Sequence, residues 1–183
     1  WLTAAELQLA ETGAALAERR AALVAALTAE LAATPEGPFA RPQLTYQPGG
    51  PLDAAELATT LAATRARDLA AGRTLTGPQR DELAVVLAGK AMPAAQCSTG
   101  EQKAMLIAIT LAHATLAARG RPGILLLDEV AAHLDPLRRA ELFARLRGGA
   151  AQVWLTGTEP APFAEILGEA ACWRVSGGMV ERF

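Results

Sequence analysis

A length of 183 residues fits one domain, or one domain with an appendage. The composition is 51% apolar, which allows a sizeable core, and the net charge of −2 argues against a basic surface for nucleic acid over the whole chain. The sequence has no apolar run as long as a membrane span and no visible signal peptide, so we expect a cytoplasmic protein without a membrane partner. Because it starts at Trp1 without an initiator Met, we also expect a piece of a longer polypeptide.

Residues 4–33 are rich in Ala, Leu and Glu, which predicts a long helix, and Thr3 and Glu6 have the spacing of a capping box at its start. One side of this helix would carry Leu9, Leu16, Leu23, Leu27 and Leu31. That side packs either on an ordinary core or on another limb of a helical arm. After a short extended stretch at 43–47, a second helix is expected between the cap Asp53 and Gly72.

From Thr74 onward, apolar strands alternate with helices, which predicts an α/β fold with parallel strands. We expect the helix at 101–118, with His113, to be buried because it is apolar nearly all round, and the aliphatic strand at 124–127 to be covered on both faces. The remaining predicted elements are strands at 83–87 and 152–156, a helix opened by Asp135-Pro136, a short helix at 162–167 and a hairpin around Ser176-Gly177-Gly178.

The strand at 124–127 delivers two carboxylates, Asp128 and Glu129, to the carboxyl end of the sheet, where α/β proteins bind ligands. This is the arrangement of a Walker B motif. Asp128 would hold Mg²⁺, directly or through water, and Glu129 would orient and deprotonate the attacking water. The plain alternative is a pair of acids that end a strand at the surface.

The segment CSTGEQK contains a second capping box, Ser98 with Glu101, for a helix that begins near Gly100. The free N–H groups of such a helix start favour anions, and Gly100 lets a phosphate approach the backbone. Gly100 precedes Asp128 by 28 residues, so the segment fits the signature motif of an ABC-type ATPase. Its candidate ATP contacts are Ser98, Thr99, Gly100, Glu101, Gln102 and Lys103.

Two later segments fit the same type of site. Leu134 and Asp135 occupy the place of a D-loop, although Asp135 also fits a simple helix cap. Thr156 and Thr158 follow the next strand, where many ABC ATPases carry a histidine that senses the γ-phosphate; an ordinary strand-to-loop turn is the alternative. The phosphate-binding loop G-x-x-x-x-G-K-S/T is absent, since the only Gly-Lys pair is followed by Ala91.

Together these motifs resemble the carboxyl-terminal half of the RecF family of DNA replication and repair proteins. Residues 77–83, GPQRDEL, are similar to the family's G-P-H-R-D-D-L segment, with Gln79 in place of its histidine. Residues 98–103, 125–135 and 152–158 are similar to its signature motif, its Walker B motif with D-loop, and its next strand. The likeness covers at least residues 72–183.

The resemblance implies a partial ABC-type ATPase head, a P-loop NTPase with a mostly parallel sheet, at residues 73–183. Residues 1–72 would be the returning part of the family's helical arm-like domain II. Two such heads, similar to those of SMC-type proteins, sandwich ATP between the Walker A loop of one and the signature helix of the other. The signature residues would therefore contact ATP held by a partner in a homodimer.

The family also implies DNA binding, notably at junctions of single and double strands, and cooperation with RecO and RecR to load recombinase at gaps, a step on which the SOS response depends. The parent protein would be a weak DNA-dependent ATPase, whereas the 183-residue chain alone would be inactive. Arg80 and Asp81 are candidates for a contact with ATP or DNA. Basic residues that either meet DNA phosphates or cover solvated helix faces are Arg65, Arg67, Arg73, Arg80, Arg138 and Arg139.

Two alternatives remain open. One is the nucleotide-binding subunit of another ABC- or SMC-like ATPase; a transporter subunit is disfavoured by Thr99, where its signature has glycine, and by Thr156, where it has histidine. The other is a non-enzymatic interaction module in which the carboxylates are structural.

Overall fold

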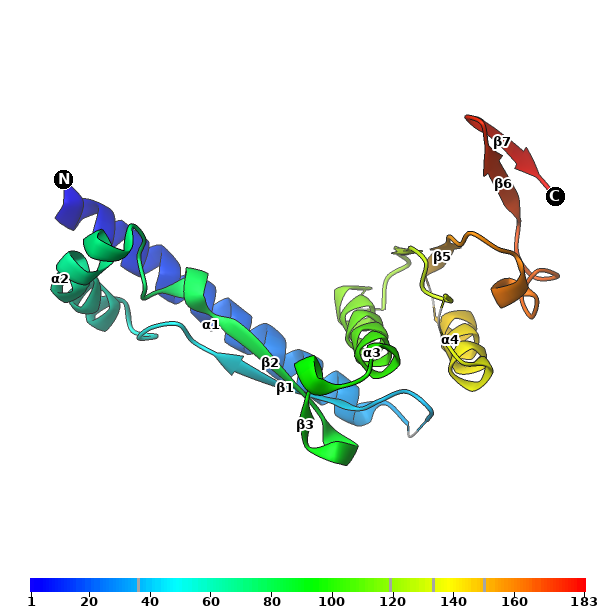
Figure 1. The fold of residues 1–183 in the computed structure, drawn as a ribbon, viewed down its shortest axis with the longest axis horizontal. Coiled ribbons are helices and arrows are strands. Elements are labelled where there is room, and N and C mark those ends of the chain that lie inside the picture. Colours follow the sequence, from blue (N-terminus) through cyan, green and yellow to red (C-terminus); the bar gives the residue numbers. More distant parts are fainter. Residues whose placement is uncertain (36, 119, 133, 150) are drawn as a thin grey trace. The chain divides into compact units, whose positions relative to one another are not determined.

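The computed structural model describes residues 1–35, 37–118, 120–132, 134–149 and 151–183. The chain forms two compact units (Figure 1). The first unit contains residues 1–34 and 41–97, and the second contains residues 35–40 and 98–183. Among the described residues, no helix has the length and apolar character that crossing a bilayer requires. The expected domain boundary after residue 72 stays a prediction.

In the first unit, α1 (Leu2–Ala33) packs against α2 (Ala54–Ala71) through small residues. Ala10 is 1% exposed and contacts Leu57 and Leu61 of α2. The predicted leucine side is wrong for three of its five leucines, which are 37–44% exposed: Leu9, Leu16 and Leu23. The physical reason is that alanine and glycine allow close approach of a second backbone, whereas leucine would hold it away.

The capping box predicted for α1 is also wrong. The helix begins at Leu2 without a side-chain cap, so Thr3 and Glu6 lie inside its first turns. Both instead accept hydrogen bonds from Arg65 of α2: its Nε lies 2.7 Å from Oε1 of Glu6, and its guanidinium also reaches Thr3 Oγ1 at 3.0 Å. The bond from Arg65 lowers the pKa of Glu6. The same residues thus join two helices rather than cap one.

The second helix confirms its predicted ends. The carboxylate of Asp53 accepts hydrogen bonds from the amides of Ala55 and Glu56, and Gly72 closes α2 in the left-handed conformation, with φ at 63°. A three-stranded antiparallel sheet completes the unit, in the order β1 (Pro42–Gln47), β2 (Glu82–Leu87) and β3 (Met92–Pro93). The strand predicted at 83–87 is therefore confirmed as β2.

The second unit confirms the predicted α/β architecture with parallel strands. β4 (Ile124–Leu127) pairs in parallel with β5 (Gln152–Leu155), with Leu127 opposite Leu155. Helices α3 (Thr99–Ala118) and α4 (Pro136–Gly148) pack into a core with β4 and the segment that follows it. The buried residues of this core are Phe39, Ala104, Ile107, Leu127, Val130, Ala131, Leu134, Leu142 and Phe143. Burial of a side chain such as Leu142 stabilises the unit by about 2 kcal/mol.

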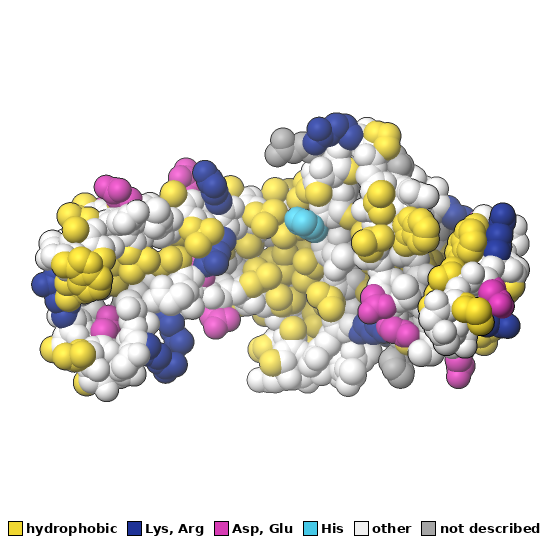
Figure 2. Space-filling view, turned by 90° about the horizontal axis from the view of Figure 1, so that it is seen from above, with side chains coloured by type: hydrophobic (Ala, Val, Ile, Leu, Met, Phe, Trp, Pro, Cys, Tyr) yellow, Lys and Arg dark blue, Asp and Glu magenta, His cyan; other side chains and the backbone are white. Residues whose placement is uncertain are grey.

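Two burial predictions for this unit are wrong. Leu106 on α3 is 63% exposed and His113 is also exposed, so this helix buries one side only. On β4, Ile124 and Leu126 are 69% and 72% exposed, because among the described residues only the opposite face of the β4–β5 pair is packed into the core. Apolar side chains are visible at the surface in Figure 2.

The last segment is an antiparallel hairpin of β6 (Trp173–Ser176) and β7 (Met179–Arg182). Gly177 and Gly178 both have positive φ, 57° and 79°, as a two-residue type I′ turn requires, so the predicted hairpin is confirmed. The helix expected at 162–167 is reduced to one 3₁₀ turn, Ala161–Phe163. The residues after it form i→i+3 turn bonds, such as the one from the Ile166 amide to the carbonyl oxygen of Phe163 at 2.8 Å, rather than continuing as an α-helix.

Candidate nucleotide site

The two acids of the predicted Walker B motif lie at the carboxyl end of β4. Asp128 is exposed and Glu129 is half-buried. Since β5 runs parallel to β4 and ends at the same edge, it brings Thr156 beside them. The Thr156 hydroxyl donates a hydrogen bond to Oδ1 of Asp128, and the Glu129 amide donates one to Thr156 Oγ1 at 3.2 Å. One hydroxyl therefore links both acidic residues.

The sequence predicts that Thr156 senses a phosphate. In the structure, its hydroxyl is hydrogen-bonded to Asp128 and to the Glu129 amide. Thr158 is exposed two residues farther along, and among the described residues only Thr156 is joined to Asp128 by a hydrogen bond. Between them, Gly157 has no room for a side chain, because a Cβ would lie 2.4 Å from the ring of Phe163. The role of both threonines toward a nucleotide stays a prediction.

The signature segment forms the capping box that the sequence predicts. Ser98 N–H and Ser98 Oγ each donate to Oε2 of Glu101 at 2.9 Å, and the Glu101 amide donates to Ser98 Oγ at 3.3 Å. α3 begins at the next residue, Thr99, and both Ser98 and Thr99 are exposed. The Ser98 hydroxyl proton is thus engaged with Glu101, and an anion at this exposed helix start would be held by the backbone amides of the first turn.

Lys103, one α-helical turn farther along, connects the signature helix to the loop after β4. Its Nζ donates to the carbonyl oxygen of Glu129 at 2.8 Å and to that of Ala132 at 2.5 Å. Sequence reasoning missed this contact. The available signal was one ammonium among apolar residues on the packed side of a helix, where a charge needs partners.

In the D-loop segment, Leu134 is 5% exposed and belongs to the core. Asp135 is the N-cap of α4: its Oδ1 accepts from the Arg138 amide at 2.9 Å, and its Oδ2 lies 3.2 Å from the Arg138 guanidinium. The hydrogen bond from the Arg138 amide, followed by the charge of Arg138, lowers the pKa of Asp135. The helix-cap role is therefore shown, while a role across two nucleotide sites stays a prediction.

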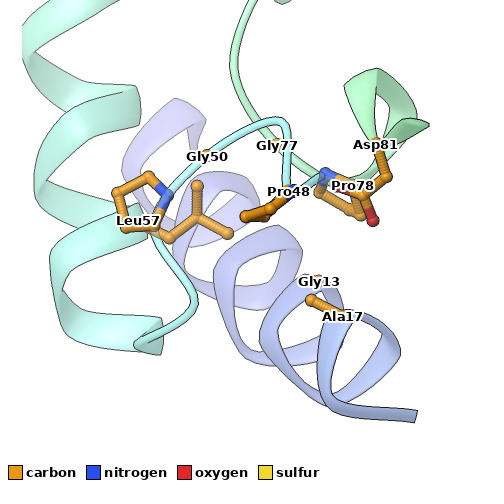
Figure 3. A pocket seen from close by; sticks show the side chains of 9 residues that line it. Gly13, Ala17, Pro48, Gly50, Leu57, Gly77, Pro78 and Asp81 are labelled. Atoms are coloured by element: carbon orange, nitrogen blue, oxygen red, sulfur yellow. The ribbon is translucent and has the colours of Figure 1, made fainter. Parts of the chain in front are cut away.

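Asp81 lies in the first unit and has an internal role there. Its side chain is 6% exposed and accepts hydrogen bonds from Arg20 at 2.7 Å, Tyr46 at 2.6 Å and the Gly49 amide at 2.8 Å. Burial raises the pKa of Asp81, but these hydrogen bonds outweigh it, so the pKa lies below its ordinary value. Figure 3 shows Asp81 and Pro78 beside the α1 positions Gly13 and Ala17. Arg80, by contrast, is exposed.

Several of the arginines suggested for DNA contact also have internal partners. Arg65 pairs with Glu6, and Arg67 lies 3.6 Å from Asp68. Arg138 donates to the carbonyl oxygen of Pro38, and Arg139 to that of Leu134. These contacts favour the structural interpretation for these four side chains.

The donor set fits Mg²⁺ only if a nucleotide supplies further ligands. Asp128 and Glu129 are adjacent carboxylates, and the described part of the chain has no group of three His, Cys, Asp or Glu residues that could hold a metal ion. One or two carboxylates completed by phosphate oxygens and water is how protein sites usually hold Mg²⁺.

Comparison with known proteins gives a consistent set of relatives. The chain is 46% identical to the DNA replication and repair protein RecF of Mesorhizobium japonicum over 98% of its length, 47% identical to that of Brucella abortus over 98%, and 46% identical to that of Caulobacter vibrioides over 96%. It spans about half the length of these curated relatives, namely 51%, 50% and 49%. No family model matches the chain.

Among solved structures, the chain resembles the recombination mediator protein RecF–ATP in the RecFOR pathway, with a TM-score of 0.73 at 18% identity. This match covers 100% of the chain and 50% of the solved protein. A related structure, RecF–ATPrS, gives the same TM-score at 19% identity. The likeness shows that the two proteins share their fold over this half.

Proposed function

The chain belongs to the RecF family of DNA replication and repair proteins, and from this premise we propose that it forms part of a weak, DNA-dependent ATPase that dimerises on ATP. In this proposal the dimer binds DNA at single-strand/double-strand junctions or on single strands. It acts with RecO and RecR to load recombinase at gaps and so supports the SOS response. Action on chromosomal DNA would place it in the cytoplasm.

One observation carries the proposal: a single unit contains both the Walker B acids, linked through Thr156, and an exposed, capped signature helix. The acids supply what hydrolysis needs on this chain, and the helix start supplies donors for a phosphate. The names of the relatives and the ATP bound by the solved RecF support the same assignment.

The proposed chemistry gives each group a distinct task. The carboxylate of Glu129 orients and deprotonates the attacking water, and Asp128 holds Mg²⁺ directly or through water. When bound, Mg²⁺ offsets the negative charge that develops on the phosphate oxygens. Thr156 keeps Asp128 in place through its hydroxyl.

The signature residues would act on ATP held by a second subunit. These 183 residues contain no phosphate-binding loop, so the β-phosphate cradle has to come from outside them. Ser98 and the amides near Gly100 would then donate to the γ-phosphate of the partner's ATP, with Thr158 and the rest of the signature segment close by. Several charge-assisted hydrogen bonds, each about 1.5–3 kcal/mol, would make ATP a strong determinant of dimerisation.

Glu129→Gln tests the proposal in a polypeptide that carries this segment at the full length of its RecF relatives. We expect this variant to dimerise on ATP, as judged by light scattering, and to hydrolyse ATP at least about 100-fold more slowly, because general-base catalysis is lost.

Glu181→Gln is a matched control, because it removes an equally charged side chain from the exposed β7 strand and should leave turnover unchanged. Wild-type turnover in Glu129→Gln would refute the assigned base. If neither the wild type nor Glu129→Gln dimerised on ATP, the proposed ATP site shared between two subunits would be refuted.

A further inference from the structure

The backbone of Glu129 has an unusual conformation. Its φ is 49°, in the left-handed region, and Ala91 is the only other non-glycine residue with positive φ among those described. Residues with a side chain adopt this conformation rarely, and it persists where surrounding contacts hold it. The contacts of the Glu129 amide and carbonyl groups are therefore expected to hold this conformation.

Both backbone groups of Glu129 have a partner from a distant part of the sequence. Its amide donates to Thr156 Oγ1 at 3.2 Å, and its carbonyl oxygen accepts from Lys103 Nζ at 2.8 Å. Lys103 also donates to the carbonyl oxygen of Ala132 at 2.5 Å. One ammonium group thus joins both ends of the Glu129–Ala132 segment.

Lys103 is itself held by a well-fixed element. The residues that follow it on α3, Ala104 and Met105, are 0% and 1% exposed. The helix start, with Ser98 and its capping partner Glu101, lies directly before it. A displacement of this helix start would therefore move the ammonium, and the ammonium would move the Glu129 peptide.

We propose that Lys103 is a positioning residue that fixes the Glu129 peptide and so aims the Glu129 carboxylate, rather than a ligand of ATP on a partner subunit. The catalytic part of this inference rests on the proposed function, whereas the structural part does not. It gives the signature segment a second task within its own subunit: a phosphate bound at the start of α3 would be signalled to the base through Lys103.

The test uses Lys103→Met, which keeps a long apolar stem and removes all donors, in the same full-length polypeptide. Without nucleotide, we expect hydrogen exchange of the amides at 129–132 to become about tenfold faster, since a charge-assisted hydrogen bond is lost. In turnover, kcat should fall by about tenfold with KM little changed. Lys103→Arg keeps donors and should retain most of the exchange protection and kcat.

Lys90→Met is the control, because it removes the chain's other lysine from the first unit and should match the wild type in both measurements. Unchanged exchange at 129–132 in Lys103→Met would overturn the proposal, as would faster exchange with unchanged kcat. Loss of ATP-dependent dimerisation with normal exchange would make Lys103 a nucleotide ligand and also overturn it. A wild type without ATP turnover would instead refute the proposed function, and exchange would still decide whether Lys103 holds the peptide.

Discussion

At the scale of single residues, buried or half-buried polar groups connect segments that are far apart in the sequence. Asp81 joins α1, β1 and the loop at Gly49 through Arg20, Tyr46 and the Gly49 amide. Leaving such a carboxylate without partners would cost about 3 kcal/mol. The GPQRDEL segment is therefore structurally important in this chain, whether or not Arg80 contacts a ligand.

The titration of Tyr46 tests the hydrogen bonds around Asp81. Its signal can be assigned because Tyr46 is the only tyrosine in the chain. Burial, followed by the hydrogen bond to Asp81, raises the pKa of Tyr46 to about 12. The ordinary value is about 10, so the folded state loses stability as the pH rises from about 10 through the raised pKa. We expect absorbance titration to give a midpoint near 12 in the wild type and a lower one in Asp81→Asn, which has no charge.

Glu82→Gln is the control for charge removal at an exposed neighbour and should keep the wild-type midpoint. An ordinary midpoint for wild-type Tyr46, with circular dichroism still showing a folded protein, would contradict the assignment. An unchanged midpoint in Asp81→Asn would also contradict it.

At the scale of elements, local chemistry sets the ends of α2, α3 and α4, whereas the start of α1 and the packed faces of helices do not follow local signals. Asp53, Gly72, Ser98 and Asp135 end or begin helices where the sequence indicates, because a cap and the amides it serves lie within a few residues. The face of α1 that packs was mispredicted, because it depends on which backbone approaches the helix. At Gly13, a Cβ would lie 3.2 Å from the ring of Pro78 and 3.3 Å from the side chain of Leu57, so this side of α1 is closely packed.

Gly49 provides a test of close packing between loops. A Cβ at Gly49 would lie 2.4 Å from Cβ of Arg80 and 2.6 Å from the carbonyl oxygen of Gly77, and backbone atoms cannot move away. We expect Gly49→Ala to lower the free energy of unfolding by about 3 kcal/mol, measured by urea denaturation. Gly89→Ala, at a position with nothing within 4 Å, should change it little. Equal stability of the two variants would exclude this packing role.

At the scale of the whole molecule, the apolar surface of the second unit indicates a missing neighbour. Ile124, Leu126 and Trp154 lie on one face of the β4–β5 pair and are 69%, 72% and 51% exposed. Monomeric proteins rarely leave such a face open to water. The curated relatives are about twice as long as this chain, and we expect their additional residues to cover this face.

The 183-residue chain provides Asp128 and Glu129 but no phosphate-binding loop. We therefore predict that the chain alone has no appreciable ATP turnover. A phosphate-release assay on the purified chain checks the expectation. The same assay on Glu129→Gln identifies contaminating activity, since turnover from a contaminant would persist in the variant. Turnover by the chain that the Glu129→Gln change abolishes would contradict the prediction.

The sequence by itself determined the features that depend on neighbouring residues. These include the capped helices α2, α3 and α4, the strand that ends in Asp128-Glu129, and the hairpin whose turn needs two glycines. Such signals are local, because each interaction joins groups only a few positions apart. The motifs also identified the family that the curated relatives show.

Only the tertiary structure decided the partners of Lys103, Asp81 and Arg65, which lie 26 to 62 residues away along the chain. It also decided that β4 has one open face and that Thr156 joins both acids. No periodicity encodes these pairings, because they arise when separate elements pack and a buried polar group takes whichever partner the fold brings within reach.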